Sequence, residues 1–300
     1  MTLTAENTHY IRQYQEATAL LAQQKLSKLN KYCMVRTIEG DRAFIDHVGE
    51  INFNQSQQRF EPISLVSPDR RRRRLTALNY NVVIGLDKKD VSRMMNSGNM
   101  DGAAFSKIQE NIIAGWSRLT DRVIAAGAVA DVYTGETGDT LLTAANDGVV
   151  TVDGTTAITY EDMVNVRRQF IDNDIPEDLA LMAAMTGEEQ EDLYLETELL
   201  STDYVSKFYS DKGVLKSAVG MDIVLFGKNT SSPVLNVASG VRKCFAMAQG
   251  AVSYGILQPL SIVIEKNPNF IDTWQMVATG AVGAVRNEGK MVVLINTTSA

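Results

Sequence analysis

The chain has 300 residues, of which 45% are hydrophobic and 22% are charged, a composition typical of globular proteins. Because a single core rarely serves so many residues, we expect two closely packed domains. The net charge of −7 argues against a protein that wraps nucleic acid over its whole surface, since phosphate binding needs an excess of basic residues.

The N-terminal region, residues 6–31, is predicted to form an amphipathic helix. Ile11, Tyr14, Thr18 and Leu21 fall on one face, and the stretch contains no Pro or Gly. A helix with so small an apolar face needs another surface to lie on. We expect no secretory signal before it, and no apolar run in the chain approaches the roughly 20 residues that span a bilayer.

Residues 44–87 have an extended, polar character. Short apolar runs lie among Gln and Asn, Pro62 and Pro68 interrupt them, and residues 75–86 form a second extended run. Two extended arms with a Pro-containing middle predict a long β-hairpin or loop. Its apolar content is too small for independent folding, so we expect it to depend on a neighbouring surface.

The strongest helical pattern in the chain covers residues 101–130. At about 25 residues this helix would be roughly 38 Å long, which suggests a spine running through its domain. Its apolar residues recur at steps of three and four and therefore form one stripe. The packing residues predicted on this stripe are Phe105, Ile108, Ile112, Trp116, Leu119 and Val123.

The middle region, residues 153–240, is predicted to be a small α/β unit. Thr159 and Asp162 have the spacing of a capping box before a helix. Residues 179–185 and 221–226 are apolar runs of strand length, and a second helix lies between them. Helix, strand, helix and strand in this order indicate an α/β arrangement.

The last fifth of the chain predicts the strands of a packed sheet and contains almost no reactive side chains. The turn at residues 286–289 separates the last two strands, with Gly289 able to take a positive φ. Because this sheet contains almost no reactive side chains, we expect a structural protein and not a hydrolase. The four predicted strands are residues 244–249, 260–264, 273–285 and 290–296.

Five consecutive arginines, Arg70, Arg71, Arg72, Arg73 and Arg74, are the sharpest local signal. They could contact nucleic acid, dock onto acids of a neighbouring subunit, or form a solvated run that protects an exposed edge. We favour docking between subunits, because guanidinium groups bind carboxylates in bidentate fashion. An acidic run offers candidate partners, although it could equally be a solvated helix face. Its members are Glu188, Glu189, Glu191 and Asp192.

No catalytic, cofactor or metal site is expected. The two histidines, His9 and His47, are too isolated for a metal site or a Ser–His pair. The glycines at residues 135–138 lack the Lys-Ser/Thr ending of a phosphate-binding loop. Cys33 and Cys244 lie far apart and are expected to be free thiols.

The order of loop, spine helix, α/β unit and terminal strands resembles the tailed-bacteriophage major capsid proteins of the Hong Kong phage fold, closest to the podophage-like branch. The resemblance covers nearly the whole chain and rests on the ensemble of its stretches. These are Pro68–Leu75, Asp87–Asp90, Arg167–Asp178, Thr197–Tyr204, Ala281–Arg286 and Lys290–Asn296.

The resemblance implies an α+β capsid fold. Its parts would be an N-terminal arm at residues 1–40 and an extended β-hairpin loop at residues 41–92. A peripheral domain with the long spine helix would follow at residues 93–152, and an axial α/β domain at residues 153–240. Residues 241–300 would be terminal strands that return to the peripheral domain.

The resemblance also implies a function: self-assembly as hexamers and pentamers into an icosahedral shell around a double-stranded DNA genome. The expected partners are other copies, a separate scaffolding protein, a portal protein, a decoration protein, and packaged DNA bound without sequence specificity. Assembly would occur in the host cytoplasm, away from membranes. Some relatives cross-link a loop lysine to a neighbour, but residues 44–87 contain no lysine, so we expect a non-covalent shell unless Lys88 or Lys89 at the base of the loop substitutes.

Two other functions stay open at this point. An encapsulin-like nanocompartment shares the fold but encloses protein cargo, so the contents of purified particles would distinguish it. A nucleic-acid-binding module that uses Arg70–Arg74 would show steeply salt-dependent DNA binding.

Overall fold

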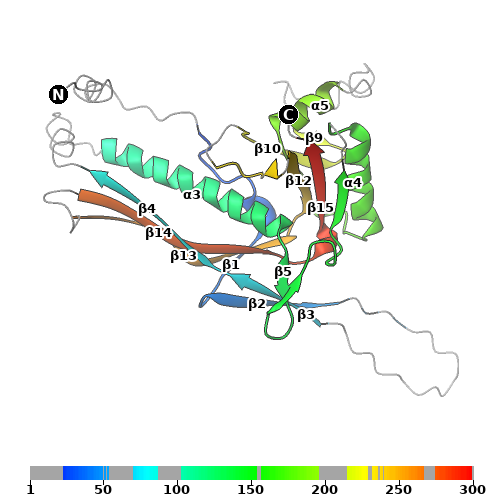
Figure 1. Cartoon of the computed structure of the whole chain (residues 1–300), viewed down its shortest axis with the longest axis horizontal. Coiled ribbons are helices and arrows are strands. Elements are labelled where there is room, and N and C mark those ends of the chain that lie inside the picture. Colours follow the sequence, from blue (N-terminus) through cyan, green and yellow to red (C-terminus); the bar gives the residue numbers. More distant parts are fainter. Residues whose placement is uncertain are drawn as a thin grey trace.

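The structure is a computed structural model. It describes residues 23–49, 51, 53, 70–86, 103–153, 157–195, 215–228, 232–235, 237–238, 240–266 and 274–298, and the structural statements below concern these residues. Within them the strands form three sheets, and a long helix crosses the molecule (Figure 1). No helix of the described residues is long and apolar enough to cross a membrane.

The first sheet is long and carries the spine helix, α3 (Ala103–Val129), along one face (Figure 1). The sequence predicts this helix over residues 101–130. The strand order of the sheet is β1-β13-β14-β4, in which β1 is parallel to β13 and the other neighbours are antiparallel. The strands are β1 (Met34–Thr37), β13 (Val252–Lys266), β14 (Trp274–Arg286) and β4 (Leu78–Leu86).

Glycines let α3 approach β14 closely. A Cβ atom at Gly280 of β14 would collide with the ring of Trp116 on α3. On the helix side, a Cβ atom at Gly127 would lie 2.8 Å from the Cβ of Ala284. The small residues of both elements therefore set the distance between helix and sheet.

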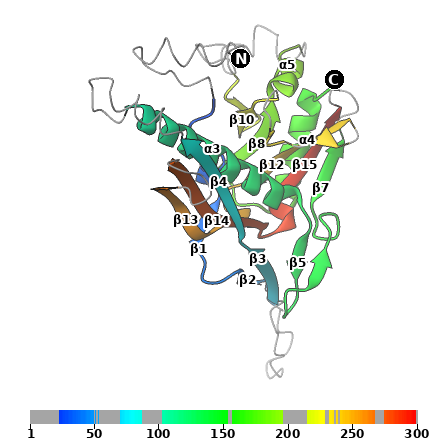
Figure 2. The ribbon, with the colours of Figure 1, turned by 60° about the vertical axis from the view of Figure 1, so that its left-hand side comes forward.

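The second sheet has seven strands and holds most of the main core. Figure 2 shows α4 (Tyr160–Asp172) and α5 (Gly187–Leu195) gathered around it. Every residue of its central strand β8 is buried, as expected for a strand covered on both faces. The order is β7-β15-β12-β8-β10-β9, with β11 paired to β12. The strands are β7 (Val150–Asp153), β15 (Val292–Thr298), β12 (Val241–Ala248), β8 (Leu181–Thr186), β10 (Met221–Phe226), β9 (Ser217–Ala218) and β11 (Val237–Ala238).

Three local predictions for this region are confirmed. Strands β8 and β10 lie where the apolar runs predict them. The capping box also forms: Asp162 N–H donates to Thr159 Oγ1 over 3.2 Å, and Thr159 N–H donates to Asp162 Oδ2 over 2.9 Å. These hydrogen bonds satisfy backbone donors that the first turn of α4 leaves open.

The third sheet contains the base of the predicted hairpin. Strands β2 (Arg42–Val48) and β3 (Arg70–Thr76) pair antiparallel, and β3 also pairs with β5 (Val132–Thr134), which pairs with β6 (Thr140–Leu142). Figure 2 shows β2 and β3 at the end of the molecule opposite α5. A small separate core holds this sheet to the body and consists of Ile38, Ile45, Leu75, Val132 and Val285.

The prediction that the four terminal runs share one sheet is wrong. Strands β13 and β14 belong to the sheet under α3, whereas β12 and β15 pair in the seven-stranded sheet. The chain changes sheets at the turns after Ala248 and Arg286. Gly289 does not have a positive φ. It begins the short helix η2 (Gly289–Met291), where a Cβ atom would collide with the carbonyl of Asp147.

The predicted helix over residues 6–31 lies mainly outside the described residues. Its described part is irregular from Gln23 to Leu29, followed by the single turn η1 (Asn30–Tyr32). The N–H groups of Lys28 and Leu29 donate to the carboxylate of Asp121 on α3 over 3.0–3.1 Å. These donors therefore bind the spine helix instead of closing a helical turn.

Candidate functional site: the hairpin and its buried junction

The strand β3 divides the arginine run between two faces. Successive side chains of a strand point to opposite faces, so Arg70, Arg72 and Arg74 share one face and Arg71 and Arg73 share the other. We call the first the outward face, because it also carries exposed residues of β2. The second faces the body of the subunit.

Arg72 and Arg74 on the outward face bind acids of their own subunit. Arg72 donates to both carboxylate oxygens of Asp46, over 2.6 and 3.2 Å, and this contact lowers the pKa of Asp46. Arg74 donates to Asp139 over 2.9 Å and stacks 4.0 Å above the centre of the Tyr133 ring. Exposed pairs of this kind contribute about 0–1 kcal/mol each.

Arg73 on the other face is 1% exposed, and its guanidinium forms an ion pair with the buried Asp147. Its Nε also donates to the carbonyl of Asn287 over 3.2 Å. The interpretation of all five arginines as contacts to a neighbour is therefore wrong for Arg73. The alternation of the strand places this side chain inside the subunit, where a carboxylate compensates its charge.

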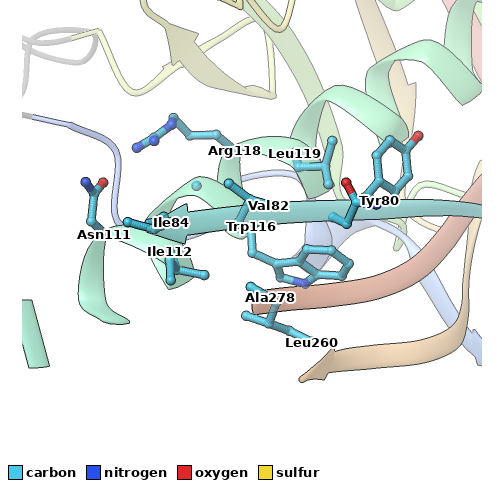
Figure 3. A pocket seen from close by; sticks show the side chains of 12 residues that line it. Tyr80, Val82, Ile84, Asn111, Ile112, Trp116, Arg118, Leu119, Leu260 and Ala278 are labelled. Atoms are coloured by element: carbon cyan, nitrogen blue, oxygen red, sulfur yellow. The ribbon is translucent and has the colours of Figure 1, made fainter. Parts of the chain in front are cut away.

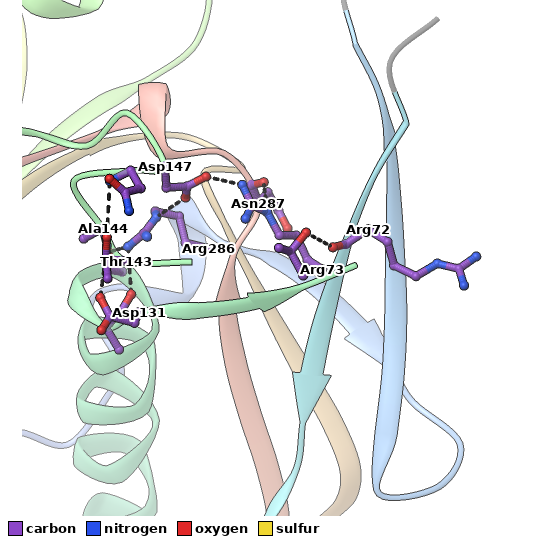
Figure 4. A network of polar contacts seen from close by, with 12 residues as sticks. Arg72, Arg73, Asp131, Thr143, Ala144, Asp147, Arg286 and Asn287 are labelled. Carbon is purple, nitrogen blue, oxygen red and sulfur yellow. Dashed lines mark hydrogen bonds and ion pairs between the residues drawn. The ribbon is translucent and has the colours of Figure 1, made fainter. Parts of the chain in front are cut away.

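Arg286 completes the arrangement, which we call the buried junction: Arg73, Asp147 and Arg286. Arg286 is fully buried, and its Nε donates to Asp147 over 2.9 Å. Its Nη1 donates to the carbonyls of Ala128 and Ala130 at the end of α3, over 2.7 and 3.0 Å. Figure 4 shows Arg286 beside Asp147 and close to the end of this helix. A cation is favourable there, because the last carbonyls of a helix lack partners within it.

The buried junction carries more positive than negative charge. Two guanidinium groups share one carboxylate, and Nη1 of Arg73 and Nη2 of Arg286 have no hydrogen-bond partner among the described residues. Burial lowers the pKa of Arg286, and the hydrogen bond to Asp147 opposes that change. The junction thus connects the base of the hairpin, the end of α3 and the end of β14 through a single carboxylate.

Two residues of the acidic run also bind within the subunit. Glu189 is 1% exposed, accepts a hydrogen bond from Arg242 over 2.6 Å and another from Thr297 over 2.9 Å. Glu188 forms ion pairs with Arg242, over 2.6 Å, and with Lys228. The prediction that Glu189 meets a neighbour is wrong, because folding brings the distant Arg242 of β12 beside it. We call Arg242, Glu188 and Glu189 the axial cluster.

The other two acids remain at the surface of α5. Glu191 is exposed and Asp192 is partly buried. Burial raises the pKa of Asp192, and the charges of the neighbouring glutamates raise it further. A hydrogen bond from the backbone of Ile158 acts in the opposite direction. Their role as subunit contacts stays a prediction.

Apolar side chains are exposed at the end of β2 and at the described residues just after it. Val48 is 66% exposed, Ile51 is 54% exposed and Phe53 is fully exposed. An exposed group of apolar residues on one projection is typical of a surface that another molecule covers.

The predicted stripe of the spine helix lies along the long sheet. Ile108 and Ile112 pack near Met276 of β14, and Trp116 and Val123 pack against the main core. Leu119 lines a groove beside β4 (Figure 3). The side chain of Phe105 lies outside the described residues.

The sequence did not predict the roles of Asp147 and Arg286 in the buried junction, nor that of Asp121, which binds the segment before η1. Asp147 occurs in a polar turn and is 74 positions from Arg73, so no local pattern connects them. Arg286 directly follows an apolar run, which is the one signal that indicates a buried charge at a strand end. Asp121 has ordinary spacing for the solvent side of a helix, yet it is fully buried.

No group of three or more His, Cys, Asp or Glu side chains that could hold a metal ion occurs in the part of the chain that the structure describes. Cys33 and Cys244 are free cysteines there. Burial raises the pKa of the Cys33 thiol to about 12, with the charge of Asp121 adding to the effect.

Comparison with known proteins gives a consistent result. The family model described as phage capsid protein matches residues 7–299. The solved capsid of cyanophage P-SCSP1u has a TM-score of 0.63 at 15% identity, covering 94% of this chain and 91% of that one. A structure of Gordonia phage Cozz has a TM-score of 0.65 at 10% identity, covering 99% and 94%. The mature capsid of bacteriophage PhiM1 has a TM-score of 0.65 at 10% identity, covering 95% and 91%. No curated protein matches the chain.

Proposed function

The chain belongs to the phage capsid protein family, and we propose that its β2–β3 hairpin joins each copy to the next in the shell. It is a major capsid protein with the α+β phage capsid fold, and it forms the shell of a phage virion. The observation that carries the proposal is the division of the hairpin: one face is fixed to the body through Arg73, and apolar side chains are exposed beyond it.

The two faces of the hairpin support different roles. The buried junction fixes the angle at which the hairpin leaves the body, because Arg73 and Arg286 bind the same carboxylate. The outward face offers Arg70 together with the exposed Val48, which lies opposite it in the strand pairing. Repeated weak contacts of this kind hold a closed shell together, since each subunit has several neighbours at once.

The same reasoning supports a division of the chain. We propose an arm at residues 1–40, an extended loop at 41–92, and a peripheral domain at 93–152. The axial domain consists of residues 153–240 together with β12 and β15, because β12 pairs with β8 and β15 pairs with β12 in the same sheet. This assignment differs from the sequence prediction only in the terminal strands.

We propose a non-covalent shell of hexamers and pentamers, since residues 44–87 offer no lysine for a cross-link. A separate scaffolding protein, a portal protein and a decoration protein are the proposed partners, with assembly in the host cytoplasm. The net charge of −7 fits a container that holds double-stranded DNA without binding it tightly. Burial of Arg73 leaves less of the arginine run for nucleic acid, so a DNA-binding module is disfavoured.

The double variant Val48→Ser/Phe53→Ser tests the hairpin contact. Both side chains are exposed in the subunit, so the free energy of unfolding should change by less than about 0.5 kcal/mol. Sedimentation velocity should show subunits or capsomers in place of shells. Ile171→Ser, at an exposed position of α4, is the matched control for folding. Shells at the wild-type yield from the double variant would contradict the proposal.

A further inference from the structure

A wide hollow with a basic lining lies between α3 and residues 23–28, and Phe226 at the end of β10 forms part of its wall. Its volume is about 1000 Å³, and no acidic side chain occurs among the described residues that line it. This concentration of positive charge contrasts with the net charge of −7 of the chain. We call it the basic hollow, and its cations are Lys25, Lys28, Arg118 and Arg122.

Neutral groups hold two of these cations in place. Arg118 Nη1 donates to the side-chain oxygen of Gln23 over 2.6 Å and to the carbonyl of Gln24 over 3.3 Å. Lys28 Nζ donates to the carbonyl of Leu225 over 2.6 Å. All three acceptors are uncharged oxygens, so they position the guanidinium and ammonium groups without compensating their charges.

The buried carboxylate of Asp121 on α3 offsets only part of this charge. It accepts hydrogen bonds from Ser27 Oγ over 2.5 Å and from the backbone N–H groups of Lys28 and Leu29 over 3.0 Å. The side-chain amide of Gln24 donates to the same carboxylate. Four cations against this one carboxylate leave an excess of three positive charges at the hollow.

The other two cations, Lys25 and Arg122, have no ion-pair partner among the described residues. Nε of Arg122 is buried and has no hydrogen-bond partner there. Arg118 and Arg122 are also four positions apart on α3, the spacing at which like charges repel each other across one helical turn. An anion bound beside both guanidinium groups would remove this repulsion.

The basic surface follows α3 beyond this hollow. A second hollow shares Arg122 and Val234 with the first and adds Lys243 of β12. Arg118 and Arg122 alone are separated by about 6 Å along the helix axis. A single small anion contacts only part of such a strip, whereas a DNA duplex presents one phosphate for about every 1.7 Å of its axis.

We propose that the basic hollow binds phosphate groups of double-stranded DNA packaged in the shell. The inference rests on the proposed function, because a shell around a genome brings a duplex to every copy of the hollow. Lys and Arg bind phosphates without regard to base sequence. Each contact needs only to be weak, because many copies act on one DNA molecule at once. The side of α3 that carries Arg118, which extends away from Trp116 (Figure 3), then faces the interior of the shell.

Binding of a short fluorescent duplex to the full chain before assembly tests the proposal, because residues of one copy line the hollow. Fluorescence anisotropy measures the binding constant over a range of salt concentrations. For four phosphate contacts, the logarithm of the binding constant should fall against the logarithm of the salt concentration with a slope of about −3.6. The variant Lys25→Gln/Arg122→Gln removes two of the four cations and should make this slope shallower by about 2.

The matched control is Arg168→Gln/Lys216→Gln, which also removes two positive charges, at exposed positions outside the hollow. It should bind the duplex with the slope of the wild type. Sedimentation velocity then follows shell formation separately. Lys25→Gln/Arg122→Gln should form shells at the wild-type yield, because neither residue lies on the hairpin, so a failure of DNA binding is distinguished from a failure of the hairpin contact.

Four results would overturn the proposal. The wild type fails to bind the duplex at low salt, or the hollow variant and the control have equal slopes, which would place the DNA on other residues. Poly-glutamate binds in place of DNA and its binding is lost in the hollow variant, which would assign the hollow to an acidic protein segment. The hollow variant loses its shells, which would make the hollow a contact between copies.

Discussion

The buried junction and the axial cluster differ in their balance of charge: the junction has one carboxylate for two arginines, whereas the axial cluster has two carboxylates for Arg242, one of which also pairs with Lys228. In the junction two arginines share one carboxylate, and two guanidinium nitrogens lack hydrogen-bond partners. In the axial cluster two glutamates share Arg242, and none of its three side chains has a buried polar atom without a partner. Arg73, Asp147 and Arg286 in the junction and Arg242 and Glu189 in the axial cluster are buried, and an uncompensated charge is costly there, whereas Glu188 is partly exposed.

The buried junction depends on a single carboxylate, and the axial cluster does not. Removing Glu189 leaves Glu188 beside Arg242, whereas removing the charge of Asp147 takes away the carboxylate that pairs with both buried arginines and leaves only the more distant charge of Asp131 acting on Arg286. The junction also connects three elements, namely β3, the end of α3 and the end of β14. The axial cluster connects α5 to β12 within the axial domain. We infer that the junction sets the position of the hairpin and that the axial cluster stabilises the axial domain.

The largest effect is expected for Asp147→Asn, which keeps the shape of the side chain and removes its charge. Loss of one partner from a buried ion pair costs about 3–5 kcal/mol, and here two arginines lose the same partner. Chemical denaturation of the unassembled subunit would measure the change. Arg73→Met is the comparison variant and should cost less, because Asp147 and Arg286 then form a neutral pair. A smaller loss for Asp147→Asn than for Arg73→Met would refute the charge balance.

Glu189→Gln should have an intermediate effect of about 1–3 kcal/mol, because the hydrogen bonds weaken while Glu188 continues to compensate Arg242. The same denaturation measurement applies. If this variant loses as much stability as Asp147→Asn, the contrast between the two clusters is wrong.

The smallest effect concerns pH. Burial, together with the charges of Arg73 and Arg36, lowers the pKa of His47 from its ordinary value of 6.5, and Glu288 and Asp46 oppose the change. The unfolded chain then binds the proton more tightly, so stability contributed by neutral His47 is present above pH 6.5 and is lost as the pH falls below it. His47→Gln should flatten the decline of stability just below pH 6.5. An unchanged slope would contradict this assignment.

The axial cluster should respond at lower pH. Burial opposes ionisation of Glu189, but hydrogen bonds from Thr186, Arg242 and Thr297 outweigh it, and its pKa lies below the ordinary value of 4.5. Stability from this carboxylate is therefore lost only as the pH falls through that lowered pKa. Denaturation of Glu189→Gln should show its difference from the wild type shrinking in that acidic range and not near pH 6.5.

Much of the fold could be predicted from local patterns. The stripe of α3, the capping box at Thr159 and the buried strand β8 each depend on residues close in sequence, and all three are present. The division of the terminal strands between two sheets could not be predicted, because all four runs are similarly apolar. Their partners, β4 for one sheet and β8 for the other, lie far away in the chain.

The site was predictable only in part for the same reason. The arginine run marks the hairpin, and alternation along β3 separates its members into two sets. Which set faces inward depends on the small core around Leu75 and on Asp147, and neither is visible from the run itself. Likewise, the local sequence indicates that Glu189 is exposed to solvent. It is buried because β12 pairs with β8 and brings Arg242 beside it.

Arginine labelling tests the central claim most directly. Dissociated, folded subunits and intact shells are treated briefly with phenylglyoxal, and labelling of each arginine in residues 70–74 is followed by mass spectrometry of peptides. We expect Arg73 to be protected in both samples, whereas Arg70 should be labelled in subunits and become protected in shells. Labelling of Arg73 at the rate of Arg70 in folded subunits, or of Arg70 equally in both samples, would contradict it.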